Sequence, residues 1–156
     1  MRDTFNFAAY IENCIEADDV TEFNKKIEHF ENHHDSCLYS CIEHNSINIA
    51  KHIIENWKYT NTREIGDYMK YTAYMDRVEI MKMIFNKTKH IGRHDVHNAL
   101  LANSRNVIDY IAKEPSFSIE DYVTHTKLSR SRDSINYAIR KEQYYKRITR
   151  IEEHLK

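Results

Sequence analysis

An internal repeat constrains this chain more than any other feature of its sequence. At five places a β-branched or aromatic residue is followed four positions later by Ile, and the first members stand 26, 31, 27 and 28 residues apart. Residues at i and i+4 share one face of a helix, so each pair predicts the apolar stripe of a short helix. The five pairs are Phe23/Ile27, Ile49/Ile53, Ile80/Ile84, Val107/Ile111 and Ile135/Ile139.

A second short apolar pattern precedes each pair, and segments with Asn, Asp and Ser stand between the two patterns, at residues 17–19, 43–46, 75–76, 103–105 and 131–133. These residue types satisfy backbone groups in tight turns. Each unit therefore predicts a helix, a turn and a second helix. Helices of eight to ten residues are marginal alone, so stacking of the units must bury a continuous core. The units cover approximately residues 5–33, 34–62, 63–94, 95–122 and 123–156.

The scarcity of Gly and Pro supports an all-α fold. The chain has 2 Gly and 1 Pro among 156 residues, which argues against sheets with many tight turns and against Gly-rich phosphate loops. A length of 156 residues favours one domain, residues 1–156. Three Cys are too few for a disulfide framework and indicate a reducing compartment. We expect no signal peptide and no membrane span, and therefore a cytoplasmic protein.

Two of the units resemble ankyrin repeats. Residues 38–54 follow the ankyrin pattern Leu-His-x-Ala-Ala-x-x-Gly-His-x-Glu-Ile-Val-Lys-x-Leu-Leu, and residues 69–85 do so as well, with Val78–Ile84 on the second-helix motif. Residues 106–111 give a weaker match. The resemblance implies an ankyrin-like solenoid of about five stacked helix-turn-helix units in a single domain.

The departures from the ankyrin pattern are specific. The Thr-Pro that opens the first ankyrin helix is absent from every unit, and Asn45 or Asp76 replaces the Gly of the inter-helix turn. Intervals of 26–31 residues are shorter than the usual ankyrin period, so we expect reduced or absent β-hairpin fingers. The Ile-, Asn-, Lys- and Tyr-rich composition is similar to that of repeat proteins from viruses and phages.

The resemblance implies recognition of a protein partner, without catalysis and without a cofactor. Ankyrin-like stacks bind partners with their loops and first helices, which here carry Tyr39, Lys70, Tyr71 and Asn98. Tyr suits such a surface because it offers a large contact area and a polar tip. The function we expect is that of a protein-interaction module, such as a viral or phage factor that binds and inhibits a host defence protein in the host cytoplasm.

The distribution of charge leaves nucleic-acid binding open as an alternative. The net charge is −1, but residues 1–35 carry −6 and residues 127–156 carry +5. Lys and Arg side chains neutralise phosphates, and Tyr rings stack on unpaired nucleobases. A second interpretation of this end is a solvated helix over about residues 134–155, whose basic side chains face water and whose apolar residues face the core: Ile135, Ile139, Ile148, Ile151 and Leu155. The candidate contacts are Arg130, Arg132, Arg140, Lys141, Lys146 and Arg147.

A metal site is a further alternative, and a metal-dependent enzyme ranks third among the functions considered. His34, Cys37, Cys41 and His44 lie on roughly one face of a helix. His34 and His44 would stand about 15 Å apart along the helix axis, too far for one zinc ion to bind all four. Core packing of the cysteines explains the same pattern, because free Cys is often buried.

Other catalytic signals are weak. His90, His94 and His97 form a second cluster, which could bind a metal ion only if the segment were helical. The chain has no Gly-x-Ser-x-Gly elbow, no phosphate-binding loop of the Walker type and no His-Glu-x-x-His motif. The sequence therefore predicts a protein that is not an enzyme.

Overall fold

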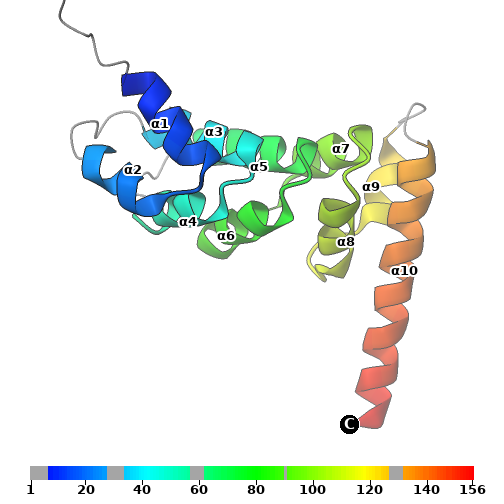
Figure 1. Ribbon diagram of the computed structural model, residues 1–156. Coiled ribbons are helices and arrows are strands. Elements are labelled where there is room, and N and C mark those ends of the chain that lie inside the picture. The colour runs from blue at the N-terminus through cyan, green and yellow to red at the C-terminus, as the bar shows by residue number, and fades with distance from the viewer. Residues whose placement is uncertain (1–6, 28–33, 57–61, 90, 127–131) are drawn as a thin grey trace, which may run out of the picture.

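The computed structural model describes residues 7–27, 34–56, 62–89, 91–126 and 132–156, which form ten helices and no strand (Figure 1). The prediction of an all-α chain is confirmed for these residues. The helices are α1 (Phe7–Glu16), α2 (Val20–Ile27), α3 (His34–His44), α4 (Ile47–Glu55), α5 (Thr62–Tyr74), α6 (Val78–Thr88), α7 (Arg93–Leu101), α8 (Arg105–Lys113), α9 (Ile119–His125) and α10 (Arg132–Leu155).

The helices pack as an array of consecutive pairs in two layers (Figure 1). The odd-numbered helices are called first helices here and the even-numbered helices second helices. Among the first helices, α1 packs on α3, α3 on α5 and α5 on α7. The second helices pack in the same order from α2 to α10. Short amphipathic helices reach stability in this way, because each pair buries its apolar face against the next.

The apolar pairs of the repeat form the core of the second layer in four of the five units. Both members of the pairs from Phe23/Ile27 to Val107/Ile111 are buried, as the sequence predicts. The prediction for the fifth unit is wrong by one position. Helix α10 buries Ser134, Ala138 and Glu142, and leaves Ile135 and Ile139 partly exposed.

The turns between the helices of a pair share one geometry. Asp18, Asn45, Asp76 and Asn103 each follow a first helix with a positive φ between 51° and 58°. The N–H of the next residue donates to the carbonyl five positions back at 2.9 Å in all four turns. This is the Schellman ending of a helix, in which Asn and Asp tolerate the left-handed conformation that Gly more often adopts.

The same turns hold neighbouring pairs in register. The Asp18 carboxylate accepts from the N–H groups of Asn48 and Ile49 at 3.0 and 2.9 Å, so it caps helix α4 of the next pair. Asp76 caps helix α8 in the same way through the Val107 N–H at 2.9 Å. Arg77 of the third turn links the third pair to the second, since its guanidinium donates to two backbone carbonyls of α3 at 2.9 and 2.7 Å.

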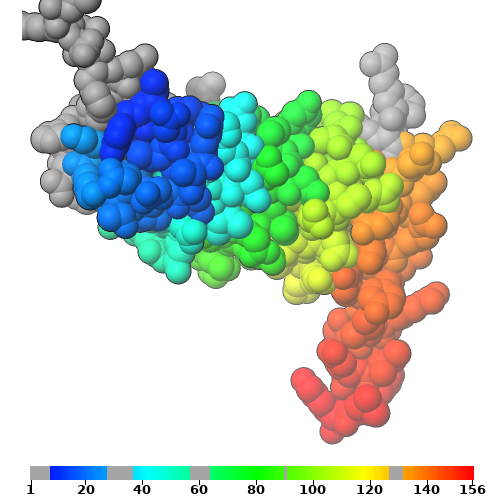
Figure 2. Space-filling model, in the orientation of Figure 1, coloured from blue at the N-terminus to red at the C-terminus, as the bar shows by residue number. Residues whose placement is uncertain are grey.

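The last pair departs from this plan. Helix α10 has 24 residues, packs on α8 with residues that include Tyr145, and projects beyond the array at its C-terminal end (Figures 1 and 2). The interpretation that placed Ile151 and Leu155 toward the core is wrong, because their side chains are 58% and 83% exposed. Among the described residues, no helix combines the length and the apolar composition needed to cross a bilayer.

Candidate interaction surface

The first helices present equivalent positions side by side on one face of the array. Residues six positions before the four left-handed turn residues are Glu12, Tyr39, Lys70 and His97, and residues two positions before them are Glu16, Glu43, Tyr74 and Leu101. All eight side chains are exposed or half-buried. Because the helices from α1 to α7 pack in sequence, these positions form two parallel rows. We call these eight residues the first-helix face.

Aromatic and apolar side chains occupy the centre of the first-helix face. Tyr39 is 40% exposed, and its ring lies 4.6 Å from that of the buried Tyr68 and 5.6 Å from that of Tyr71. Tyr74 and Leu101 follow on α5 and α7, with 56% and 48% of their side chains exposed. Rigid aromatic side chains held by their neighbours are typical anchors of protein interfaces.

The four residues expected to contact a partner lie on α3, α5 and α7. The structure brings Tyr39 and Tyr71 into ring contact, and Lys70 stands at the position equivalent to Tyr39 while pairing with Asp67 at 3.2 Å. Asn98 occupies the position equivalent to Tyr71 on the next first helix and is half-buried. The sequence reasoning missed Tyr74 and Leu101. The repeat register could have identified them, because the equivalent positions in the first two units are Glu16 and Glu43, and a position that carries Glu is expected to face solvent.

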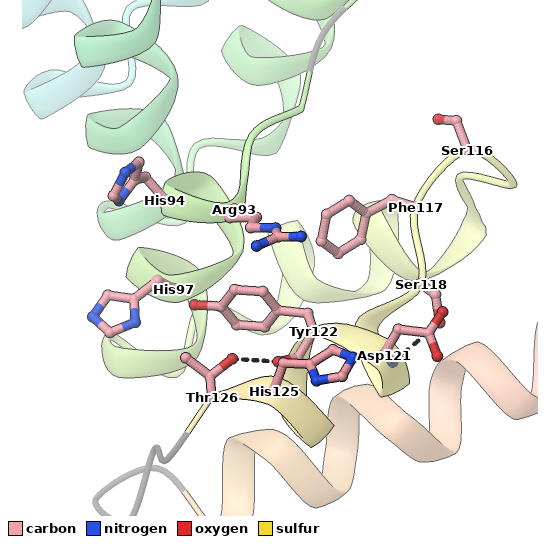
Figure 3. Close-up of a pocket in the computed structure, with 10 residues that line it drawn as sticks. All are labelled: Arg93, His94, His97, Ser116, Phe117, Ser118, Asp121, Tyr122, His125 and Thr126. Atoms are coloured by element: carbon pink, nitrogen blue, oxygen red, sulfur yellow. Dashed lines mark hydrogen bonds between the residues drawn. The ribbon is translucent and has the colours of Figure 1, made fainter.

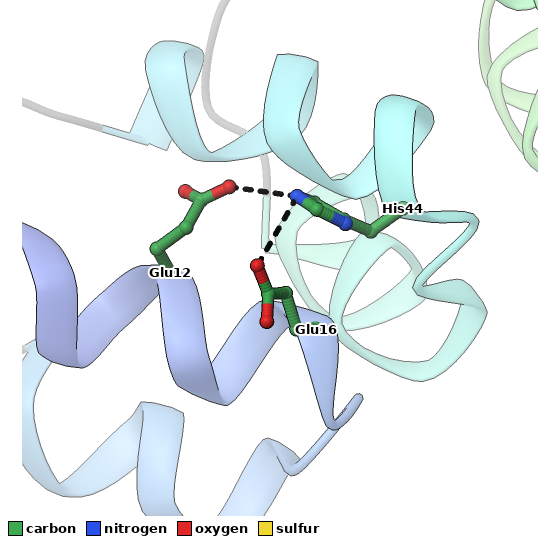
Figure 4. A group of neighbouring side chains, drawn as sticks. All are labelled: Glu12, Glu16 and His44. Atoms are coloured by element: carbon green, nitrogen blue, oxygen red, sulfur yellow. Dashed lines mark hydrogen bonds and ion pairs between the residues drawn. The ribbon is translucent and has the colours of Figure 1, made fainter.

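The N-terminal end of the first-helix face is acidic. His44 of α3 lies between two carboxylates of α1, with its Nε2 atom 2.8 Å from Glu12 Oε1 and 3.9 Å from Glu16 Oε1 (Figure 4). Ser40 Oγ donates to the other Glu12 oxygen at 3.0 Å. In the described part of the chain, Glu12, Glu16 and His44 are the one group of three possible metal ligands whose ligand atoms lie within 4.8 Å of one another. The hydrogen bonds of Glu12 with His44 and Ser40 join α1 to α3.

The metal site considered from the sequence is not assembled by the described residues. Cys37 and Cys41 are buried in the core, whereas His44 points to Glu12 and Glu16. The side chain of His34 lies outside the described residues. Burial raises the pKa of the Cys41 thiol and that of Cys14, so these thiols are protonated at neutral pH.

A basic, aromatic pocket of about 570 Å³ lies at the other end of the first-helix face, between α7 and α9 (Figure 3). Phe117 and Tyr122 form its aromatic wall, with ring centroids 6.3 Å apart. Burial raises the pKa of the Tyr122 hydroxyl, and the nearby charge of Arg93 opposes this shift. The titratable groups that line the pocket besides Tyr122 are Arg93, His94, His97 and His125, together with the carboxylate of Asp121.

These four basic side chains make no hydrogen bond or ion pair to any other residue that the structure describes. Their nitrogen donors are therefore open to an external acceptor. The sequence pointed to His94 and His97 but not to His125, which α9 supplies from 28 residues further along the chain. His90, the third member of the predicted cluster, lies outside the described residues.

The pocket exists because α9 leaves the layer of first helices. Helix α9 packs on α10 instead of stacking closely along α7. A buried carboxylate holds it there: Glu142 of α10 accepts from the Ile119 N–H at 3.1 Å and from the Glu120 N–H at 2.8 Å. A negative charge at these free N–H groups also complements the helix dipole.

The basic residues of the C-terminal region are divided between paired and unpaired groups. Lys141 pairs with Asp109 at 3.4 Å, Lys146 pairs with Glu142 at 3.4 Å, and Arg140 donates to the Asn136 carbonyl at 3.2 Å. Arg132 and Arg147 are exposed, and Arg130 lies outside the described residues. Half of the predicted nucleic-acid contacts thus already have partners within the protein.

Comparisons with known proteins identify no relative: no family model, no curated protein and no solved structure matches this chain.

Proposed function

We propose that the protein is an ankyrin-like protein-interaction module, and that it binds its partner across the first-helix face. The observation that carries the proposal is the exposure of Tyr39, Tyr74 and Leu101 on three successive first helices, with Tyr39 in one row of the first-helix face and Tyr74 and Leu101 in the other. Large apolar side chains gathered on one face of a folded protein are characteristic of interaction sites. The consecutive helix pairs and their common turns support the ankyrin-like solenoid.

The charges around the apolar centre specify the chemistry of the partner. Glu12, Glu16 and Glu43 lie toward the N-terminal end, whereas Arg93 and the pocket histidines lie toward the other end. A complementary partner offers an apolar patch with basic groups on one side and an acidic side chain on the other. We propose that the acidic side chain enters the pocket and binds Arg93.

The viral and phage resemblance of the repeats favours a host protein as this partner. A module of this kind acts by covering a surface of its target, which is the inhibitory role that the sequence leads us to expect. Nucleic acid is less well supported, because Lys141 and Lys146 are engaged by Asp109 and Glu142.

Affinity capture from a lysate of the natural host cell, followed by mass spectrometry, tests the proposal. The tagged wild-type protein is compared with the double variant Tyr39→Ala, Tyr74→Ala. The control is Lys51→Ala, Asn86→Ala, which changes exposed residues of the second helices α4 and α6. We expect a partner that wild type and control retain after nuclease treatment and that the tyrosine variant loses.

Two results contradict the proposal. Equal retention of every partner by the tyrosine variant would show that the first-helix face is not the binding site. Loss of all partners on nuclease treatment, together with loss on reversing Arg132 and Arg147 to Glu, would assign the function to nucleic acid. Circular dichroism of each variant must show the wild-type helix content.

A further inference from the structure

The projecting end of α10 carries an apolar stripe that lies outside the buried core, and its Tyr144 ring contacts Tyr145 and Lys141 of the same helix. Tyr144, Ile148, Ile151 and Leu155 are spaced four, three and four residues apart. Tyr144, Ile151 and Leu155 are 54%, 58% and 83% exposed. The spacing is that of the a and d positions of a heptad, with Ile148 and Leu155 at a and Tyr144 and Ile151 at d.

The stripe lies on a different side of α10 from the side that packs on the array. Ser134, Ala138, Glu142 and Tyr145 face the protein body. At about 100° per residue, the stripe is centred about 100° around the helix from that side. The end of this helix projects beyond the array in Figures 1 and 2, and the stripe from Tyr144 to Leu155 runs along about 16 Å of helix axis.

The charges beside the stripe are complementary to a second copy of the same helix. Arg147 stands at a g position and Glu152 at an e position, five residues later. In a parallel pair of helices, the g residue of one chain meets the e residue of the other at this separation. Neither side chain has a hydrogen bond or ion pair within the described chain. Two-fold symmetry makes the same contact twice.

We propose that the protein forms a parallel homodimer through the C-terminal half of α10, with the stripe as its seam and two Arg147–Glu152 ion pairs between the chains. An antiparallel pairing would place Arg147 beside His154 and lose this complementarity. The two-fold axis places the two arrays on opposite sides of the helix pair, since each body lies to the side of its seam. Two first-helix faces on one dimer would then raise the avidity for a repeated target.

The helix is organised for this contact before association. Its first half is already held by α8 and α9, so pairing does not carry the nucleation cost of an isolated two-heptad peptide. This offsets the short length of the seam. We expect a dimer of moderate affinity, which dissociates on dilution to about micromolar concentrations.

Sedimentation equilibrium of the full chain tests the seam. We expect a reversible dimer for wild type and for the control Gln143→Asp, an exposed position away from the stripe. Ile151→Asp should weaken the dimer by at least about tenfold without changing the helix content, because the side chain is exposed in the monomer. A monomeric wild type at about millimolar concentration, or an Ile151→Asp variant as dimeric as wild type, would overturn the proposal.

Charge exchange tests the pairing and its direction. Arg147→Glu and Glu152→Arg should each weaken the homodimer, because each brings like charges together at both ion pairs. Their equimolar mixture should recover wild-type association, since both pairs become attractive again. Oxidation of Leu155→Cys should give a covalent dimer, whereas Gln143→Cys should not. No recovery in the mixture, or no cross-link through residue 155, would overturn the parallel arrangement.

Discussion

In the first four helix pairs each first helix lies along the next, whereas in the last pair α9 stands apart from α7 and only α10 continues the array. The regular pairs use Asp or Asn in left-handed turns, and two of these turn residues cap a helix in the following pair. The last pair uses the buried Glu142, which holds α9 against α10.

Regular stacking in the first four pairs and its interruption in the last pair produce different surface features. Regular stacking produces the two rows of the first-helix face, which place equivalent positions of successive helices side by side. The break in stacking produces the pocket between α7 and α9, and the extra length of α10 produces an exposed stripe. Uniform repetition therefore builds the proposed interaction surface, and departure from it builds the pocket and the exposed stripe.

The largest expected effect comes from a charge placed in the regular core. Ile80 is fully buried between the layers, so Ile80→Asp should destabilise the fold by at least about 4 kcal/mol and unfold the array. The matched substitution in the last pair, Ile151→Asp, should leave the melting temperature of the monomer unchanged within about 2 °C, because that side chain is exposed. Thermal unfolding followed by circular dichroism measures both.

The carboxylate of Glu142 should have the next largest effect. Glu142→Ala removes the acceptor of two backbone N–H groups of α9 and should cost about 2–3 kcal/mol. Hydrogen exchange should rise in α9 far more than in α1–α6, because the loss is confined to the last pair. The control is Glu152→Ala, an exposed acid on the same helix, studied at a dilution where the chain is monomeric. Uniform loss of protection across all helices would contradict this local role.

A turn residue of the regular region should have a smaller effect. Asp76→Ala removes the cap of α8 and places Ala in a left-handed conformation, which together should cost about 1–2 kcal/mol in chemical unfolding. Asp76→Gly loses the same cap but tolerates the positive φ, so it should cost less than Asp76→Ala. An equal cost for the two variants would show that the backbone conformation contributes nothing.

The smallest effect concerns the contact of α8 with α10. Burial raises the pKa of Asp109, but the hydrogen bond from Tyr145 at 2.9 Å and the charges of Lys113 and Lys141 lower it below its ordinary value. The ionised form is therefore the stabilising one. Its contribution is present above the unfolded pKa of about 3.9 and is lost as the pH falls through the lower folded value.

Asp109→Asn tests this contribution. We expect the variant to be less stable than wild type by about 1 kcal/mol at pH 7, and the difference to disappear as the pH falls below about 3. Urea unfolding at a series of pH values measures the difference. A constant difference over the whole range would mean that the charge of Asp109 is not what holds α10 on α8.

Features that depend on residues close together in the sequence could be predicted, whereas features that depend on contacts between distant residues could not. The buried pairs from Phe23/Ile27 to Val107/Ile111 could be predicted, because helical periodicity sorts apolar residues onto one face. The pair Ile135/Ile139 follows the same pattern, and the prediction that it is buried was wrong, because both side chains are only half-buried. In α10 the buried positions include Glu142, whose burial depends on N–H donors of α9 that periodicity does not represent.

The candidate site shows the same division. Tyr39 and Tyr71 could be selected from the repeat register, and the structure places their rings in contact. The contact of His44 with Glu12 and Glu16 spans about thirty residues of sequence, and nothing near His44 distinguishes these carboxylates from Cys37 or Cys41 as its neighbours. The sequence pointed to His94 and His97 but not to the pocket that they line, because the pocket depends on the displacement of α9.

The sequence by itself determined the helices, their turns and the period of the array, because these depend on hydrogen bonds and side-chain periodicity within about five residues. Asp or Asn at each regular turn both permits the left-handed backbone and ends the helix. Tertiary structure alone decided which faces meet, where α9 lies and how far α10 projects. Those outcomes depend on contacts between residues that are distant in the chain, where the burial of one side chain is settled by the donors and apolar surface that every neighbouring helix supplies.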